Sequence, residues 1–343
     1  MKLAIICFTA AGKLLSLQLA PALTADVCTL FTTQKLADQT ICSYGTDLTG
    51  FVGHAFTQYD GLVFIGASGI AVRAVAPHLN SKTTDPAVVV MDEKARFSIS
   101  LVSGHIGCAN SLALRLAHAV NATPVITTAT DVNGLFSIDS WAAHHNLHIE
   151  NMHVAKEISA RLLHHLPVGF TTNQFTLPPL PKGFVETAAP VGAVISIYET
   201  QAPYAQTLRL VPKLVSIGIG CKKGTSAEQI ESLFLHCLQK HNLSLHSIQQ
   251  ICSIDLKRHE PGLLQFCKNY TLPLVCYSSQ QLTKAQGNFT PSAFVQAITG
   301  IDNICERACV LGAKNGTLLI PKHSANGVTF AAALQNRRFP FEY

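Results

Sequence analysis

The fold of this chain is decided by residues 61–79, GLVFIGASGIAVRAVAPHL, where a short apolar run passes directly into a helical pattern. Residues 61–67 are apolar and end in small side chains, as in a buried strand. In residues 69–79 the apolar side chains recur at helical spacing, and Pro77 lies near the end of the pattern. A buried strand that leads straight into a helix is the repeating unit of α/β proteins.

The same alternation continues on both sides of this unit. Strands are predicted at 3–8, 87–92, 97–102 and 124–128, and helices at 12–20 and 108–120. The charged turn at 93–96 joins the two middle strands as a hairpin. Residues 1–132 are therefore predicted to form a layered N-terminal α/β domain with a largely parallel sheet.

Residues 133–212 form a small middle region with a different pattern. Positions 133–170 have a helical pattern rich in histidine, and 171–190 is a connector rich in Pro and Gly. Residues 191–199 and 207–214 are predicted to pair as antiparallel strands, which would close this region.

The α/β alternation restarts in residues 213–337, which predicts a separate C-terminal α/β domain. Its strands are expected at 214–220, 247–255, 272–277 and 317–321, and its first helix over 221–241. Thr225 and Glu228 have the spacing of a capping box for that helix. The chain as a whole is thus of the α/β class, with two α/β domains and a middle region between them.

Composition excludes several classes of protein. The 343 residues carry a formal net charge of +5, without any basic tract longer than two residues, so no nucleic-acid partner is expected. No apolar stretch reaches the roughly 18 residues of a membrane helix, so no membrane is expected either. The apolar start is too short for a signal peptide and is interpreted as the first strand, which predicts a cytoplasmic protein. The 11 cysteines, with no CxxC pair, are then expected to be reduced.

Two pairs of residues have the spacing of metal ligands. His144 and His148 are four residues apart, but a solvated polar face is favoured over a metal site there. Cys305 and Cys309 are also four apart on an expected helix, where a buried core face is favoured. No metal bound by the protein itself is therefore expected.

The loop after the 61–67 strand is the first candidate site. Ser68 and Gly69 begin a helix whose backbone N–H groups can hold a carboxylate, although a tight turn without a ligand is the alternative. Arg73 follows one turn later and can pair with a carboxylate, and Lys82 continues the polar edge.

The loop after the 97–102 strand presents a histidine between glycines. Ser103 and Gly104 precede His105, and Asn110 follows in the next helix. Histidine titrates near neutral pH and is suited to proton transfer, although a lone histidine is more often structural.

A third cluster follows the 124–128 strand. Thr127, Thr128 and Asp131 lie there, and a capped turn without a ligand is the alternative. If the strands that end at 66, 102 and 128 open on one edge of the sheet, Arg73, His105 and Asp131 converge on a single site.

The glycine-rich loop at 218–225 is the candidate site of the second half. It matches neither a dinucleotide fingerprint nor a Walker loop, but Gly220, Lys222 and Lys223 at a helix start can hold an anion. A plain turn with solvated lysines is the alternative. Glu306 and Lys322 are expected near this loop.

Together these segments resemble the CbiG family. The match covers about residues 50–335 and rests on 66–110, on TPVITTATDVNGLFSID at 123–139, and on three stretches of the second half: SIGIGCKKGT, NICERACVLGA and LLIPKHSANGVTFAAAL. Residues 140–210 match weakly. Cys108 stands where the family usually has Gly, and Arg307 stands where it usually has a small residue.

The resemblance implies a cobalt-precorrin-5A hydrolase of the anaerobic route to cobalamin. Such an enzyme adds water to a macrocyclic δ-lactone and releases a two-carbon unit as acetaldehyde. The cobalt arrives inside the tetrapyrrole substrate, so no added cofactor is implied. A homo-oligomer and a transient hand-over to other cobalamin-pathway enzymes are both compatible with this function.

The resemblance supplies no catalytic roles, so these are assigned from the residues themselves. His105 is the candidate general base, oriented by Asp131, with N–H groups at the helix starts near 69 and 107 for the oxyanion. The remaining candidates would hold the substrate's carboxylates and other polar groups. A non-catalytic tetrapyrrole carrier and a phosphate-binding enzyme using the 218–225 loop are the competing interpretations.

Overall fold

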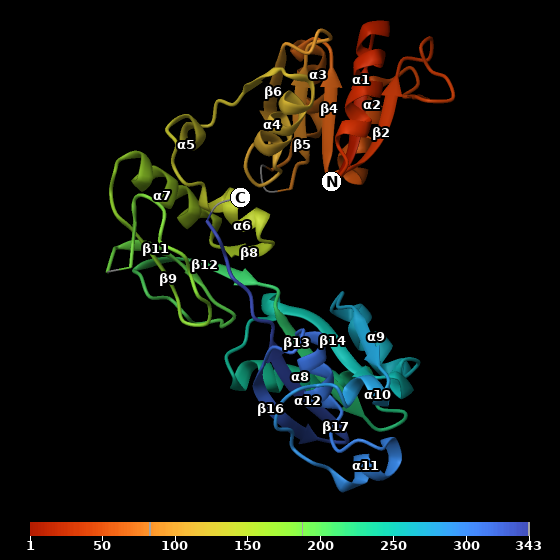
Figure 1. The fold of residues 1–343 in the computed structure, drawn as a ribbon, viewed down its shortest axis with the longest axis vertical. Coiled ribbons are helices and arrows are strands. Elements are labelled where there is room, and N and C mark those ends of the chain that lie inside the picture. Colours follow the sequence, from red (N-terminus) through yellow and green to blue (C-terminus); the bar gives the residue numbers. More distant parts are fainter. Residues whose placement is uncertain (82–83, 187, 342–343) are drawn as a thin grey trace. The chain divides into compact units, whose positions relative to one another are not determined.

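A seven-stranded sheet organises the first part of the chain. The structure is a computed structural model that describes residues 1–81, 84–186 and 188–341 (Figure 1). It divides into two compact units, Met1–Ala143 and His144–Tyr343. The first sheet has the strand order β3-β2-β1-β4-β5-β6-β7.

The elements of the first unit follow the expected alternation, with three additions. The strands are β1 (Lys2–Cys7), β2 (Val27–Thr32), β3 (Cys42–Ser43), β4 (Gly61–Ile65), β5 (Ala87–Met91), β6 (Phe97–Val102) and β7 (Thr123–Val125). The helical segments are α1 (Ala10–Ala22), α2 (Leu48–Gln58), α3 (Ser68–Val75), η1 (Ala76–His78), α4 (Ala109–Val120), α5 (Ala129–Val132) and α6 (Ile138–His144). The sequence patterns did not predict β2, β3 or α2.

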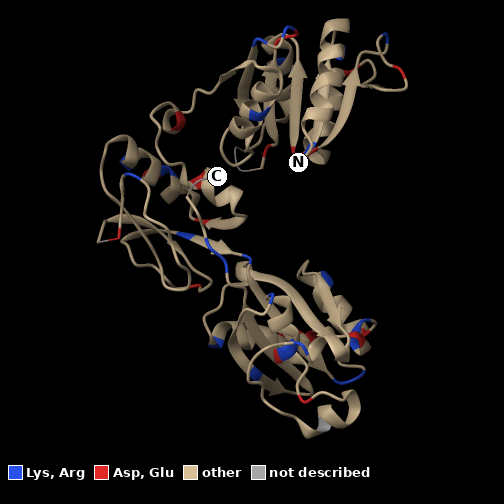
Figure 2. Ribbon diagram, viewed as in Figure 1, with Lys and Arg blue, Asp and Glu red and all other residues tan. Residues whose placement is uncertain are grey.

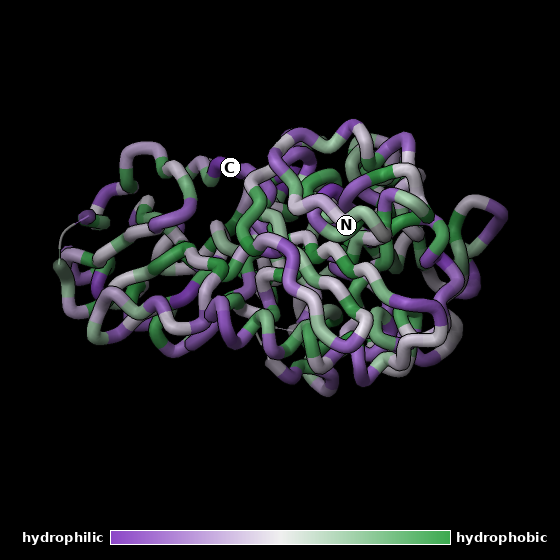
Figure 3. Tube along the Cα trace, turned by 90° about the horizontal axis from the view of Figure 1, so that it is seen from below, coloured by the Kyte–Doolittle hydropathy of each residue, from purple (hydrophilic) through white to green (hydrophobic). Residues whose placement is uncertain are grey.

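Helices cover both faces of this sheet, so its central strands are buried on each side. Along β1, Leu3 and Ile5 pack with residues of α1 and α4, whereas Ala4 and Ile6 pack with residues of α2 and α3. Strands with two buried faces have continuous apolar sequences, which is why β4 could be recognised. In Figure 3 hydrophobic stretches of the chain alternate with hydrophilic ones along the trace.

The direction of β6 decides which loops share an edge of the sheet. β1, β4 and β5 are parallel, but β6 is antiparallel to β5, which confirms the predicted hairpin, and β7 is parallel to β6. Val102, at the end of β6, pairs with Val88 near the start of β5. The ends of β6 and β7 therefore lie at the opposite edge from the end of β4, and the expected convergence of all three loops on one edge is wrong.

The second unit begins with a five-stranded sheet of order β10-β9-β11-β12-β8. Its elements are β8 (Leu147–Glu150), α7 (Met152–Leu163), β9 (Val168–Thr172), β10 (Phe184–Val185), β11 (Val191–Ile195) and β12 (Gln206–Pro212). The helical pattern predicted for 133–170 is wrong at β8 and at the start of β9.

The predicted antiparallel pairing of the last two strands of this region is also wrong, because β11 and β12 are parallel. The connection at 196–205 returns along the sheet without forming a hairpin. Ile197 and Glu199 on this connection exchange backbone hydrogen bonds with Ser244 and Asn242, which hold it away from a direct turn.

The third sheet has the order β15-β14-β13-β17-β16. Its strands are β13 (Val215–Cys221), β14 (Ile248–Ile254), β15 (Leu274–Tyr277), β16 (Thr317–Ala325) and β17 (Val328–Leu334). The helical segments are α8 (Ala227–Lys240), η2 (Leu245–Ser247), η3 (Asp255–Lys257), α9 (Pro261–Asn269), α10 (Ser279–Leu282), α11 (Ala293–Thr299) and α12 (Cys305–Gly312).

Two details of this sheet position the loop at 218–225. The helix α8 starts later than predicted, and its capping box is formed by Ser226 and Gln229 in place of Thr225 and Glu228. The backbone of α12 packs directly on β13, because a Cβ at Gly218 would lie 1.8 Å from the carbonyl oxygen of Cys305.

Lys and Arg positions, blue in Figure 2, are scattered along the ribbon of both units and are interspersed with Asp and Glu positions. None of the helices in the described part of the chain combines the length and the apolar character that a membrane crossing requires.

Candidate functional site

The loop between β6 and α4 presents His105 through an unusual backbone path. Ser103 and Cys108 both adopt the left-handed region, with φ of 59° and 67°. Glycine adopts this region without a steric penalty, so Cys108 carries a backbone strain that a glycine would relieve. The backbone N–H of Asn110 donates to the carbonyl of Gly104, and a Cβ on Gly104 would lie 2.7 Å from the Asn110 side chain.

His105 lies between two carboxylates. Its Nε2 is 2.8 Å from Asp131 Oδ2, and its Nδ1 is 3.2 Å from Asp139 Oδ1. Asp139 is buried, whereas the Asp131 side chain is 36% exposed. The structure thus brings together the two residues predicted as catalytic and adds Asp139, which the site reasoning missed.

The two carboxylates change the expected chemistry of the histidine. The hydrogen bond to Asp139 raises the pKa of His105 above its ordinary value, against the opposing effect of burial, and Asp131 raises it further. Burial alone would raise the pKa of Asp139, but hydrogen bonds from His105 and Ser137 lower it to about 2. A histidine whose two ring nitrogens both face carboxylates is stabilised as a cation. His105 is therefore better suited to donate a proton than to accept one.

Polar side chains around Asp131 complete this cluster. Thr128 and Asn110, both predicted from the sequence, donate hydrogen bonds to Asp131 Oδ2, the latter at 3.2 Å. Thr130 Oγ1 lies 3.2 Å from His105 Nε2. Asp131 is the most exposed acidic group of the cluster.

The other candidates of the first unit do not join this cluster. Ser68, Gly69 and Arg73 follow β4 and lie at the opposite edge of the sheet, where Arg73 donates to the carbonyl of Gly69 at 3.3 Å. The helix starts near 69 and 107 therefore cannot share one oxyanion. Thr127 is exposed beside the cluster, and Lys82 lies outside the described residues.

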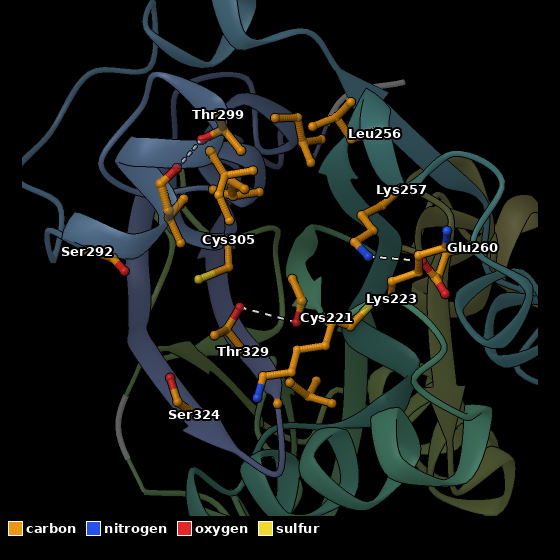
Figure 4. A pocket seen from close by; sticks show the side chains of 18 of the residues that line it. Cys221, Lys223, Leu256, Lys257, Glu260, Ser292, Thr299, Cys305, Ser324 and Thr329 are labelled. Atoms are coloured by element: carbon orange, nitrogen blue, oxygen red, sulfur yellow. Dashed lines mark hydrogen bonds and ion pairs between the residues drawn. The ribbon is translucent and has the colours of Figure 1, made fainter.

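The second unit contains a cavity of about 1040 Å³ at the carboxyl edge of the parallel strands β13 and β14. Ligands of α/β proteins usually bind at such an edge. Gly220, Lys222 and Lys223 line the cavity together with Lys322, so four of the residues predicted for this half share one site. Figure 4 shows Lys223 and Lys257 on one side of the cavity and Cys305 and Thr299 on the other.

The cavity combines a basic rim with an apolar wall. Its lysines are Lys222, Lys223, Lys257 and Lys322, and its carboxylate is Glu260. Lys257 Nζ lies 2.9 Å from Glu260, which also accepts a hydrogen bond from the backbone of Gly224 at 2.7 Å. The apolar wall comprises Ile254, Leu256, Pro261, Val295, Ile298 and Ile304. Leu256 and Ile298 remain exposed, which suits contact with a broad apolar ligand.

Glu306 shapes the cavity from behind without lining it. Its carboxylate is fully buried and accepts hydrogen bonds from Thr290, from the side chain of Asn303 and from the backbone N–H of Lys322 at 2.7 Å. A buried carboxylate with this many donors is a structural anchor. Glu306 is therefore near the 218–225 loop, as predicted, and positions Lys322.

The site reasoning missed the segment 257–260 of this cavity. A charged run, Lys257-Arg258-His259-Glu260, begins three residues after the end of β14, which is parallel to β13. Neighbouring parallel strands end at the same edge of a sheet. The position of this run in the sequence could therefore have predicted that Lys257, His259 and Glu260 line the site.

The geometry defines an α/β protein with a large basic cavity and a separate cluster of acid–base groups. Two family models match this chain. The model described as "Cobalamin synthesis G N-terminal" matches residues 50–131, and the model described as "Cobalamin synthesis G C-terminus" matches residues 215–333. The chain therefore belongs to the CbiG family.

Named relatives cover most of the chain. A cobalt-precorrin-5A hydrolase of Salmonella typhimurium is 33% identical over 95% of this chain and 96% of its own length. A cobalt-precorrin-5A hydrolase of Priestia megaterium is 32% identical over 87% of this chain and 84% of its own length. A solved structure of CobE, a protein from the cobalamin (vitamin B12) biosynthetic pathway, is 32% identical and covers 36% of this chain and 91% of its own length, with a TM-score of 0.34.

Proposed function

We propose that this protein is a cobalt-precorrin-5A hydrolase, as its named relatives are. The observation that carries the proposal is the cavity of about 1040 Å³ whose apolar wall faces a rim of four lysines. A tetrapyrrole intermediate has a broad apolar ring and peripheral carboxylates, so the wall would contact the ring and the lysines would pair with the carboxylates.

The acid–base steps are assigned to the His105 cluster. Lactone hydrolysis forms a bond from water oxygen to the carbonyl carbon and breaks the ring ester bond, which leaves a carboxylate and an alcohol. Loss of the alcohol proton then allows the adjacent carbon–carbon bond to break. The alcohol oxygen becomes the carbonyl oxygen of acetaldehyde, and the electron pair of the broken bond passes into the macrocycle.

Within this cluster, Asp131 and His105 have complementary roles. Asp131 is the more exposed carboxylate and would accept the proton of water or of the alcohol. Cationic His105, held by buried Asp139, would stabilise the developing oxyanion or return a proton. This assignment differs from the sequence-based prediction, in which His105 was the general base and Asp131 oriented it.

The reaction is proposed to need no added cofactor, because the cobalt is part of the substrate and the electron pair is accepted by the macrocycle. Neither nucleic acid nor a membrane is proposed as a partner. A cytoplasmic location is proposed, where the eleven cysteines would stay reduced.

The test is incubation of the purified chain with cobalt-precorrin-5A and an assay of released acetaldehyde. We expect release by the parent protein and a loss of about 10²-fold or more in His105→Ala, the scale for losing an acid–base group. The rate of the parent should fall as pH rises through the raised pKa of His105. Stoichiometric binding without acetaldehyde release would instead identify a tetrapyrrole carrier and refute the proposal.

A further inference from the structure

The edge of the middle sheet carries a group of side chains that neither the cavity nor the His105 cluster uses. Ligand atoms of His148, Glu150 and His246 all lie within 4.8 Å of one another. Among the residues that the structure describes, this is the one group of three or more His, Cys, Asp or Glu that meets such distances. We propose that these three side chains form a binding site for a divalent transition metal ion such as Zn²⁺.

The fold positions the ligands from two distant parts of the chain. His148 and Glu150 are two residues apart on β8 and therefore project from the same face of the strand. His246 lies on η2, just before β14. Hydrogen bonds from the backbone of Ser244 to Ile197 at 2.8 Å, and of Leu214 to Ser247 at 3.0 Å, hold η2 against the middle sheet.

The donor set matches the chemistry of the proposed ion. Two imidazoles and one carboxylate bind zinc in proteins and leave a position for water. The two rings are stacked with centroids 3.6 Å apart, so both nitrogens reach one ion only after a ring turns. His246 is exposed and free to make that turn.

The cationic neighbours of the site are themselves held by carboxylates. Arg209 lies opposite Glu150 in the β8–β12 pairing and forms an ion pair with it. Arg209 also lies 2.9 Å from Glu199, so it keeps a carboxylate partner when Glu150 turns one oxygen to the ion. Lys213 is the other nearby cation. An ion at this place would tie β8 to η2 and so join the two sheets of the second unit.

This inference revises the expectation that the protein binds no metal. Sequence spacing suggested the pairs His144–His148 and Cys305–Cys309, whereas the fold groups His148 with Glu150 and the distant His246. The site is separate from the proposed reaction, so its loss should leave acetaldehyde release unchanged.

The test is titration of the chelator-treated, full-length protein with Zn²⁺ against a chromophoric competitor. We expect one tight site per chain, a loss of at least about tenfold in affinity in His148→Ala and in His246→Ala, and no change in His153→Ala, which removes an exposed imidazole from the same histidine-rich segment. His246→Ala serves where His148→Ala folds poorly, because His246 is exposed.

Cobalt(II) substitution supplies a second measurement. Visible absorption bands of low-symmetry Co²⁺ should appear in the parent and in His153→Ala, and should be lost in His246→Ala. Zn²⁺ should also raise the melting temperature of the parent but not that of His246→Ala. Equal affinity in the parent and all three variants, or no tight site in the parent, would overturn the proposal.

Discussion

Replacement of His105 by alanine tests the cluster between β6 and α6 through its stability. In the folded protein the pKa of Asp139 falls from its ordinary 3.8 to about 2. At 1.36 kcal/mol per pKa unit this corresponds to about 2 kcal/mol of stabilisation of the buried carboxylate. Ser137 and the backbone of Ser140 supply part of it, so we expect His105→Ala to lower the free energy of unfolding by about 1–2 kcal/mol.

The effect should depend on pH in a defined way. The pKa of Asp139 is lowered, so its contribution is present above about pH 4 and is lost as pH falls towards 2. The pKa of His105 is raised, so its contribution is complete below its unfolded pKa of about 6.5 and is lost as pH rises through the folded value. The difference between parent and variant should therefore be larger at pH 5.5 than at pH 8.5.

The assay has a local reporter, because Trp141 is the only tryptophan of the chain, is fully buried and lies two residues from Asp139. Urea unfolding followed by its fluorescence measures this unit separately from the second one. His118→Ala, an exposed histidine of α4, is the matched control and should behave like the parent. Equal stability of parent and His105→Ala at pH 5.5, or a difference that grows towards pH 8.5, would refute this account of the cluster.

Three further predictions concern the cavity, a strained residue and a packed glycine. Changing Lys222 and Lys223 together to alanine should raise the Kd for the substrate by up to about 30-fold, because exposed ion pairs contribute at most about 1 kcal/mol each. The effect should be smaller at high salt and kcat should be almost unchanged. Binding titrations at two salt concentrations and steady-state kinetics check this. Cys108→Gly should raise the free energy of unfolding by up to about 1 kcal/mol in urea, whereas Cys108→Ala, which keeps the Cβ, should not. Gly218→Ala should destabilise the second unit by roughly 3 kcal/mol, because the added Cβ would lie 1.8 Å from a backbone oxygen of α12. Calorimetry measures this change, and an unchanged melting temperature would contradict the packing of α12 on β13.

The sequence predicted strands best where both faces of the sheet are buried. The β4 and β5 runs are continuous and apolar, so their pattern is unambiguous. The short edge strands β3 and β8 carry polar residues and few apolar ones, and for that reason they were not recognised. The pairing of β11 and β12 could not be read from the length of their connection, because backbone bonds to 242–244 fix its path.

The candidate site was predictable in its members but not in its grouping. His105 and Asp131 follow two neighbouring strands, so their meeting depends only on the parallel pairing of β6 and β7. Arg73 follows β4, and whether it joins them depends on the direction of β6, which the hairpin after β5 reverses. Asp139 lies beyond the last strand of this sheet, where strand periodicity carries no information about its position.

The charges of the two sites explain how the proposed reaction divides between them. The first cluster places two carboxyl groups, Asp131 and Asp139, around a single histidine, so it offers little attraction to the carboxylates of a tetrapyrrole. The cavity of the second unit has four lysines against one carboxylate and attracts them. Binding of carboxylates therefore requires positive charge, whereas a protonated histidine requires negative neighbours. Lysines around His105 would lower its pKa, whereas its present carboxylate neighbours raise it. One basic site could not meet both requirements. A protein that must grip a polyanion and also keep a histidine protonated gains from holding these functions on separate sheets.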